Sequence, residues 1–432
     1  MTAIAATHPY VRALLEGNRA LPPASQDWLR VLRARGLERA NALSVPTTRD
    51  EEWRFTDISP LLKTPFPPPA MPQLVTAADL SRFVLPEART RLVFVDGVFA
   101  AELSASPAQP EGVVVARIAA APGALIEAHL GRHAEFEMDI FAALNTAYLR
   151  DGALVSIGRG RECPQPVHLL FVATRNEATF FPRCLVVAET GATGTFIEDY
   201  VALGDGAYFT NAVTEVVVGA GARVQHVKLQ RESAAAFHIA NSSVVLGKDA
   251  SYSSSTISLG ARISRHNLNV VQRGEGANCR IDGLALVSGR QLADTHTTID
   301  HATPSGKSTQ LHKTIVGGAA HAVFNGKILV RAGAQLTDSA QQSRNLLLSP
   351  RAHVDTKPQL EIFADDVKCA HGATVGQLDA EQLFYLKSRG LPEAQARNLL
   401  TYAFGAEVID RLPVASLVER LERVVMEQTQ AV

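Results

Sequence analysis

The residue types best suited to bind a soft metal ion lie close together at Cys369 and His371. In an extended strand, residues i and i+2 point to the same face, so these side chains project side by side if the segment is a strand. A thiolate and an imidazole suit zinc or iron better than hard ions. Because a closed tetrahedral site needs four ligands, the pair is either structural or completed by another chain.

The other three cysteines form no metal motif. Cys163, Cys184 and Cys279 are isolated, and no Cys-x-x-Cys occurs. Sequence separation alone does not prevent stacked strands from bringing them together. Free cysteine is usually a small buried hydrophobe, so the spacing by itself favours a structural role for Cys369 and His371.

A second set of potential ligands alternates along one segment, at Asp294, His296, Thr298 and Asp300. Alternation places them on one face of a strand. The polar outer face of a β structure gives the same pattern and is the favoured interpretation. We expect His301, on the opposite face, to be a hydrogen-bonded core histidine.

Composition narrows the function classes. The chain has 432 residues, with 42 basic and 43 acidic residues. This balance argues against a nucleic-acid-binding protein. Four cysteines suit a reducing compartment, and neither a signal peptide nor an apolar run of membrane-spanning length is seen. With no G-x-S-x-G, Walker A or H-E-x-x-H motif, we expect a soluble cytoplasmic protein without a self-contained catalytic site.

The elements that must position these residues fall into four regions: a helical region at 1–63, a proline-rich linker at 64–91, a β core at 92–376 and a helical domain at 377–432. In the first region, Ser25 is a candidate N-cap for a helix that buries Leu29 and Leu32 and that ends near Gly36.

Short apolar triplets recur through the β core, as at Val216–Val218 and Val244–Leu246. A turn glycine and then an alanine often follow, as at Gly221–Ala222 and Gly276–Ala277. This pattern fits an all-β array, either a parallel β-helix or a sandwich. We favour the β-helix, because the repeats are single strands with corners and the one Asn-Gly hairpin signal is at Asn325–Gly326.

The last region predicts amphipathic helices. Asp379 is a suitable N-cap, and apolar stripes follow at Leu399, Leu400 and Phe404 and again after Pro413. An apolar stripe of this kind either packs into the protein core or forms a docking surface, and the pattern does not distinguish the two.

Several motifs together resemble the SufB/SufD family of iron–sulfur cluster assembly scaffolds over nearly the whole chain. They are Asp50–Asp57 (DEEWRFTD), His301 with Pro304, Ser308 and Lys313, Phe324–Ile328, Asn345–Ser349, Asp355–Ile362 and Ala364–Thr374. Asn325 stands where glutamine is expected. The SufD branch is favoured, because the SufB branch is expected to carry glutamate at His371 and extra cysteines.

The resemblance implies a right-handed parallel β-helix between two helical regions. It implies a non-catalytic scaffold subunit in a cytoplasmic complex with a SufB-like subunit and a SufC-like ABC ATPase that binds the ATP. The chain alone would hold no stable cofactor and would form a homodimer in isolation. Iron or a nascent cluster would sit transiently at the interface with the SufB-like chain.

The resemblance also implies roles for individual residues. His371, as a candidate metal ligand, and Cys369 would face the nascent cluster. The partner interface would include Lys357, Pro358, Ala373 and Thr374. The ATPase would dock on Leu383, Phe384, Leu399, Leu400 and Phe404.

Two alternatives belong beside this reading. One is a SufB-type scaffold that holds a cluster by itself. The other is a β-helix lyase or hydrolase acting on polysaccharides, which needs carboxylates clustered in a groove and usually calcium ligands. Aromatic residues make up only 6% of the chain, so sugar-stacking surfaces are sparse.

Overall fold

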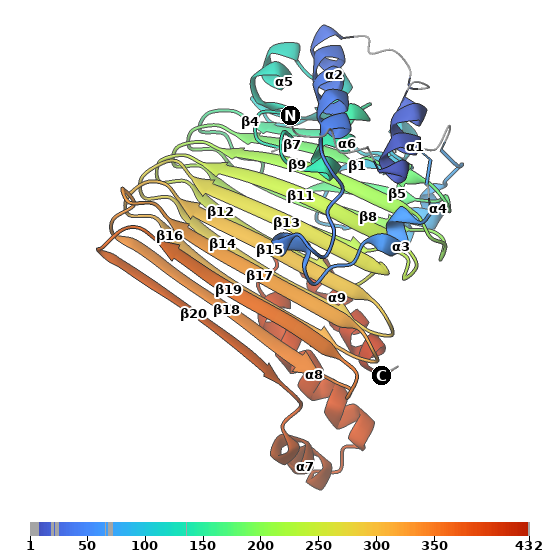
Figure 1. Ribbon diagram of the computed structural model, residues 1–432, viewed down its shortest axis with the longest axis vertical. Coiled ribbons are helices and arrows are strands. Elements are labelled where there is room, and N and C mark those ends of the chain that lie inside the picture. Colours follow the sequence, from blue (N-terminus) through green and yellow to red (C-terminus); the bar gives the residue numbers. More distant parts are fainter. Residues whose placement is uncertain are drawn as a thin grey trace.

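The computed structural model is a parallel β-solenoid with helices at both ends of the chain (Figure 1), which confirms the expected fold class. It describes residues 8–18, 21, 26–64, 66–67, 72–134 and 136–430. The chain alternates between two long sheets, called A and B, and from β7 (Arg183–Ala188) onward strands two apart in sequence order lie side by side. Asn325 and Gly326, the Asn-Gly pair, lie within a strand and form no hairpin turn.

Both sheets are parallel over most of their width, with antiparallel pairs only where β2 joins β1 and β3 joins β4. Sheet A contains, in spatial order, β2 (Val98–Phe99), β1 (Thr90–Val95), β5 (Val167–Ala173), β8 (Thr193–Ala202), β10 (Arg223–Arg231), β12 (Ser251–Ser258), β14 (Asn278–Val287), β16 (Lys307–Val316), β18 (Thr337–Leu347) and β20 (Val367–Gly376). Sheet B contains β3 (Val113–Arg117), β4 (Ala153–Ile157), β7 (Arg183–Ala188), β9 (Phe209–Val218), β11 (Phe237–Leu246), β13 (Ile263–Gln272), β15 (Leu292–His301), β17 (His321–Val330) and β19 (His353–Ile362), with β6 (Thr179–Phe180) beside β9.

The glycine–alanine corners explain the degenerate repeat. Gly221 and Gly276 adopt positive φ angles of 65° and 71°, a conformation that residues with a side chain rarely adopt. The alanines that follow, Ala222 and Ala277, are fully buried in the core between the sheets. Each of these two corners therefore turns the chain with a glycine and then fills the narrow inner edge with the smallest apolar side chain.

Helices flank the solenoid at its first turns. They are α1 (Pro9–Asn18), α2 (Asp27–Ala42), α5 (Gly123–His129) and α6 (Ile140–Ala147), with short turns of helix at α3 (Ser59–Leu62) and α4 (Ala77–Leu80) and 3-10 turns at Glu51–Trp53, Ser81–Phe83, Ala101–Leu103 and Ile118–Ala120. Apolar side chains of α1, α2, α5 and α6 share one buried cluster with the outer face of sheet B.

The expected helix after residue 25 is present, although its predicted end is wrong. Leu29 and Leu32 are buried as expected, and Ser25 lies outside the described residues. The helix α2 continues through Gly36, where an added Cβ would lie 2.6 Å from the Ala147 backbone nitrogen at the end of α6. This glycine allows two helices to approach closely and does not terminate one.

The segment expected to be almost purely β also contains α5 and α6. All eight residues of α6 are buried, so the helix has no polar face and leaves no amphipathic pattern in the sequence. Within the segment expected to be a linker, α4 and Phe83 pack against the start of sheet A, and β1 begins at Thr90.

Three helices end the chain: α7 (Ala380–Ser388), α8 (Glu393–Ile409) and α9 (Ala415–Gln430). Buried residues of α8 and α9, including Val408, Leu417 and Leu421, share a cluster with the outer face of sheet A. The apolar stripe of α9 is therefore core. Among the described helices, none combines the length and the apolar character needed to cross a bilayer.

Candidate functional site

Cys369 and His371 lie on β20, the last strand of sheet A, as the strand prediction required. Their register partners on β18 are Ser339 and Gln341, which are 2% and 1% exposed on the inner face of the solenoid. Residues in register share a face, so Cys369 and His371 also point to the inner side. There the stack of turns ends, because no strand follows β20 in the part of the chain that the structure describes.

The two side chains differ in their surroundings. Cys369 is half-buried against the apolar cluster that contains Ile328 and Val330, whereas His371 is exposed. Burial is the main cause that raises the pKa of the Cys369 thiol, and the carboxylate of Asp338 raises it further. A thiol is a poor ligand until it is deprotonated, so in this chain alone His371 is the readier donor.

A groove of about 360 Å³ follows β18 and β20 beside this pair. His371, Ala373 and Thr374 line it together with Gln341 and Arg344. The groove thus collects three of the residues expected at a cluster-bearing or partner-binding surface. It offers imidazole, amide and guanidinium groups at a place that another chain can reach.

The other two expected interface residues, Lys357 and Pro358, lie on β19, which is the last strand of sheet B. Proline donates no backbone hydrogen bond and is tolerated at such an edge. Lys357 already has a partner within the chain, since its Nζ lies 2.7 Å from Glu51 Oε1. Both atoms are solvent-accessible, so this surface ion pair is weak.

The remaining cysteines are buried in the core between the sheets. Burial raises the pKa of Cys163 and Cys184, and raises that of Cys279 to about 12. Within the described ranges, no cysteine belongs to a group of three or more metal-ligating side chains. What this chain offers at Cys369 and His371 is an incomplete ligand set.

The polar row on β15 is occupied by the N-terminal motif. Asp294 Oδ2 accepts hydrogen bonds from Thr56 Oγ1 at 2.6 Å and from Arg265 Nη1 at 2.5 Å. Arg265 also stacks 3.8 Å above the Trp53 ring and donates to the Glu52 carbonyl oxygen. The row therefore lies on an outer face, as the sequence analysis favoured. It binds the N-terminal motif, which is more than 200 residues away in sequence.

Charge holds this anchor together. His296 lies 3.0 Å from Asp294 Oδ1 and 3.2 Å from Glu52 Oε2. Burial alone would raise the pKa of Asp294, but Arg265 and His296 hold it well below its ordinary value. Burial alone would lower the pKa of His296, but Asp294 and Glu52 raise it.

The end of the same strand is structural as well. Asp300 forms an ion pair with Arg331 at 2.6 Å. His301 is fully buried and its Nε2 lies 2.9 Å from Ser308 Oγ. Burial lowers the pKa of His301 to about 4, so it is a neutral, hydrogen-bonded core histidine, as expected.

The residues expected to dock an ATPase divide into two sets. Phe384 on α7 and Leu399 on α8 are 73% and 44% exposed. Leu383 and Leu400 are partly covered, and Phe404 packs against the sheet A cluster with Lys313 Nζ 4.7 Å from its ring. An outward apolar patch therefore remains on α7 and the first half of α8.

Sequence reasoning missed one group of ligands, His321, His353 and Asp355, which meet on the outer face of sheet B. The spacing of His353 and Asp355 was a usable signal, because i and i+2 share a strand face. His321 lies on the neighbouring strand, and only the solenoid register brings it to the other two.

Comparison with known proteins identifies the family. Residues 171–404 match the model for the SufBD core domain of the SUF system of FeS cluster assembly, and residues 5–169 match the SufBD protein N-terminal region. An iron–sulfur cluster assembly SufBD family protein of Synechocystis is 40% identical over 95% of this chain and 94% of its own. The iron–sulfur cluster assembly protein SufD of Escherichia coli is 34% identical over 92% of this chain and 90% of its own.

The SufD protein of Bacillus subtilis is 27% identical, again over 92% of this chain. Both family models and full-length similarity cover the solenoid and the flanking helices alike. The chain therefore belongs to the SufBD family of iron–sulfur cluster assembly proteins.

Proposed function

We propose that this chain is a SufD-type scaffold subunit without catalytic activity of its own. It assembles with a SufB-like subunit, pairing at the last turn of the solenoid, and with a SufC-like ATPase that docks on α7 and α8. A nascent cluster is cargo that passes through the interface with the SufB-like chain. His371 contributes a ligand there, and Cys369 stands beside it.

One observation carries this proposal. An incomplete ligand set, Cys369 and His371, lies on a ten-residue strand that pairs with β18 on one side and with no other strand among the described residues. An unpaired edge strand is a template for another chain. A partner that covers this edge places its own side chains beside His371, which supplies the ligands that this chain lacks.

The decisive variant is His371→Ala, studied in the assembled complex. His371 is exposed, so we expect its replacement to leave a native fold and intact assembly. Cluster formation from iron and sulfide under anaerobic conditions should be abolished. Cys369→Ser should have a milder effect, because partial burial raises the pKa of the thiol and makes it the poorer donor. Wild-type cluster formation by the His371→Ala complex, with normal circular dichroism, would refute the proposal.

The same assay separates a SufD-type subunit from a SufB-type scaffold that holds a cluster by itself. The chain alone, reconstituted and desalted, should keep no stoichiometric cluster in its Mössbauer spectrum, since a [4Fe–4S] cluster normally needs four thiolates. It should also hydrolyse no ATP, because it has no P-loop. A stable cluster lost on mutating Cys163, Cys184 and Cys279 would favour the alternative.

A further inference from the structure

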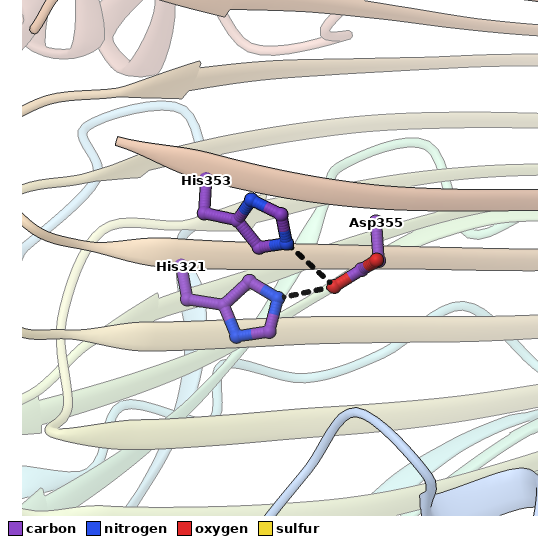
Figure 2. A group of neighbouring side chains, drawn as sticks. All are labelled: His321, His353 and Asp355. Carbon is purple, nitrogen blue, oxygen red and sulfur yellow. Dashed lines mark hydrogen bonds and ion pairs between the residues drawn. The ribbon is translucent and has the colours of Figure 1, made fainter. Parts of the chain in front are cut away.

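Two histidines and an aspartate meet on the outer face of sheet B (Figure 2). The inward-facing pair Cys369 and His371 lies on β20 of the other sheet. His321 begins β17, and its register partner on β19 is His353. Asp355 follows two residues after His353 and so projects from the same face. The three side chains come from two adjacent, hydrogen-bonded strands, which fixes their backbone positions.

The ligand atoms lie at distances that suit a common metal ion. Asp355 Oδ2 is 2.7 Å from His321 Nε2 and 3.2 Å from His353 Nε2. One ligand atom from each residue lies within 4.8 Å of the other two. Bonds of about 2.0–2.1 Å to zinc in a tetrahedral site separate neighbouring ligand atoms by about 3.3 Å. Small side-chain rotations are therefore enough to place an ion between the three.

The site is also accessible. The side chains of His321 and Asp355 are about one quarter exposed, at 26% and 25%, and that of His353 is 65% exposed. An ion can enter from solvent, and coordination positions not taken by the protein remain open to water. The centroids of the two imidazole rings lie 5.0 Å apart. Both rings turn toward the carboxylate, as Figure 2 shows.

We propose that His321, His353 and Asp355 form a binding site for a divalent first-row transition ion. Two imidazole nitrogens and one carboxylate oxygen suit Zn²⁺, Fe²⁺ or Co²⁺ and discriminate against Mg²⁺ and Ca²⁺, which prefer oxygen ligands alone. The site is separate from His371 and does not depend on the proposed scaffold function.

The test uses the untagged full-length chain, stripped of metal with a chelator and titrated calorimetrically with Zn²⁺. We expect one tight equivalent, no comparable binding of Mg²⁺, and visible d–d bands with Co²⁺. His353→Ala and Asp355→Asn should each weaken Zn²⁺ binding about 100-fold or more, since even residues that only support ligands contribute 10–100-fold. Asp355→Asn keeps the shape and a hydrogen-bond acceptor, so it separates coordination from simple hydrogen bonding.

One control locates the site. Asp365→Asn removes an exposed carboxylate elsewhere on the chain and should bind Zn²⁺ as the wild type does. Zn²⁺ should also raise the Tm of the wild type but not of His353→Ala, because a ligand that binds only the native state stabilises it. Unchanged Zn²⁺ affinity in folded His353→Ala and Asp355→Asn would reduce the triad to a hydrogen-bonded cluster and overturn the proposal.

Discussion

At the scale of single residues, His296 shows how a potential ligand becomes an anchor. It lies between Asp294 of its own strand and Glu52 of the N-terminal motif, and its side chain is 12% exposed. Its imidazole ring therefore joins two carboxylates that belong to segments far apart in the sequence. Histidine and aspartate are residue types that can bind a metal ion. Here, however, His296 is already paired with Asp294 and Glu52.

His296→Gln should destabilise the protein in a pH-dependent way. Because Asp294 and Glu52 raise the pKa of folded His296 against the effect of burial, its contribution is fully present below the unfolded pKa. That contribution is lost as pH rises through the folded pKa. The difference in free energy of unfolding from wild type should be about 1.5–3 kcal/mol near pH 6, as for charged hydrogen bonds, and should shrink toward pH 9.

Urea unfolding at a series of pH values measures this difference. His129→Gln is the control with the opposite sign, since burial lowers the pKa of His129 and its contribution is lost as pH falls. A His296→Gln difference that stays constant or grows with pH would contradict the assignment.

At the scale of elements, a buried ion pair fastens the N-terminal helices to sheet B. Glu215 on β9 accepts hydrogen bonds from Arg183 Nη2 at 2.5 Å and from the backbone nitrogens of Gly131 and His133, just after α5. Arg183 also donates to Asn145 in α6. Both members of the ion pair are fully buried.

Glu215→Ala should lower the free energy of unfolding by about 3–5 kcal/mol, because it leaves the Arg183 charge buried without a counterion. Chemical denaturation provides the measurement. The matched control is Lys387→Ala, which breaks an exposed pair with Glu393 and should cost less than about 1 kcal/mol. Similar losses in both variants would show that burial does not set the strength of the pair.

The C-terminal helices carry both core and surface. Removing them whole would uncover the outer face of sheet A, which α8 and α9 bury, so a truncation cannot isolate their binding role. Point changes on the exposed patch can. Phe384→Ser with Leu399→Ser removes apolar area that is already in water and should leave Tm nearly unchanged.

In the same double variant, the affinity for the ATPase should fall at least 10-fold, as expected when exposed apolar anchors are removed. Loss of co-elution on size-exclusion chromatography measures this effect. Leu421→Ala is the contrasting variant. Its side chain projects from α9 into the buried cluster on sheet A, so the variant should lose about 2–5 kcal/mol of stability while keeping the exposed patch. Undiminished ATPase binding by the surface variant would show that the docking site lies elsewhere.

At the scale of the whole molecule, the two ends of the solenoid differ. The first edge of sheet A is the two-residue strand β2 and that of sheet B is the five-residue β3, both antiparallel to their neighbours. The last edges are β19 and β20, each ten residues long. Short edge strands discourage pairing with other chains, and long ones invite it.

Ala370→Lys should therefore block association at the open end. Ala370 is exposed on β20, and a lysine on an edge strand opposes pairing. Light scattering should show less homodimer for the isolated chain, and affinity for a SufB-like subunit should fall at least 10-fold. Ala101→Lys, at an exposed alanine near the first turns, should behave as wild type. Equal association by both variants would place the interface away from β20.

The sequence by itself determined the parts that depend on local rules. Strand alternation put Cys369 and His371 on one face, and single short strands with corners, together with few hairpin signals, favoured a solenoid over a sandwich. The helix Ile140–Ala147 was not predicted, because a helix buried on every side has no periodic pattern of apolar and polar residues. The domain boundaries and the roles of the site residues remain predictions.

Only the tertiary structure decided which residues meet across turns. Thr56 bonds to Asp294 across 238 positions, and His321 reaches Asp355 across 34. The spacing of the repeats is irregular, so the sequence does not reveal which positions stack in register. The same holds for the apolar stripes: α9 is core and α7 is surface, because sheet A extends under one and not the other.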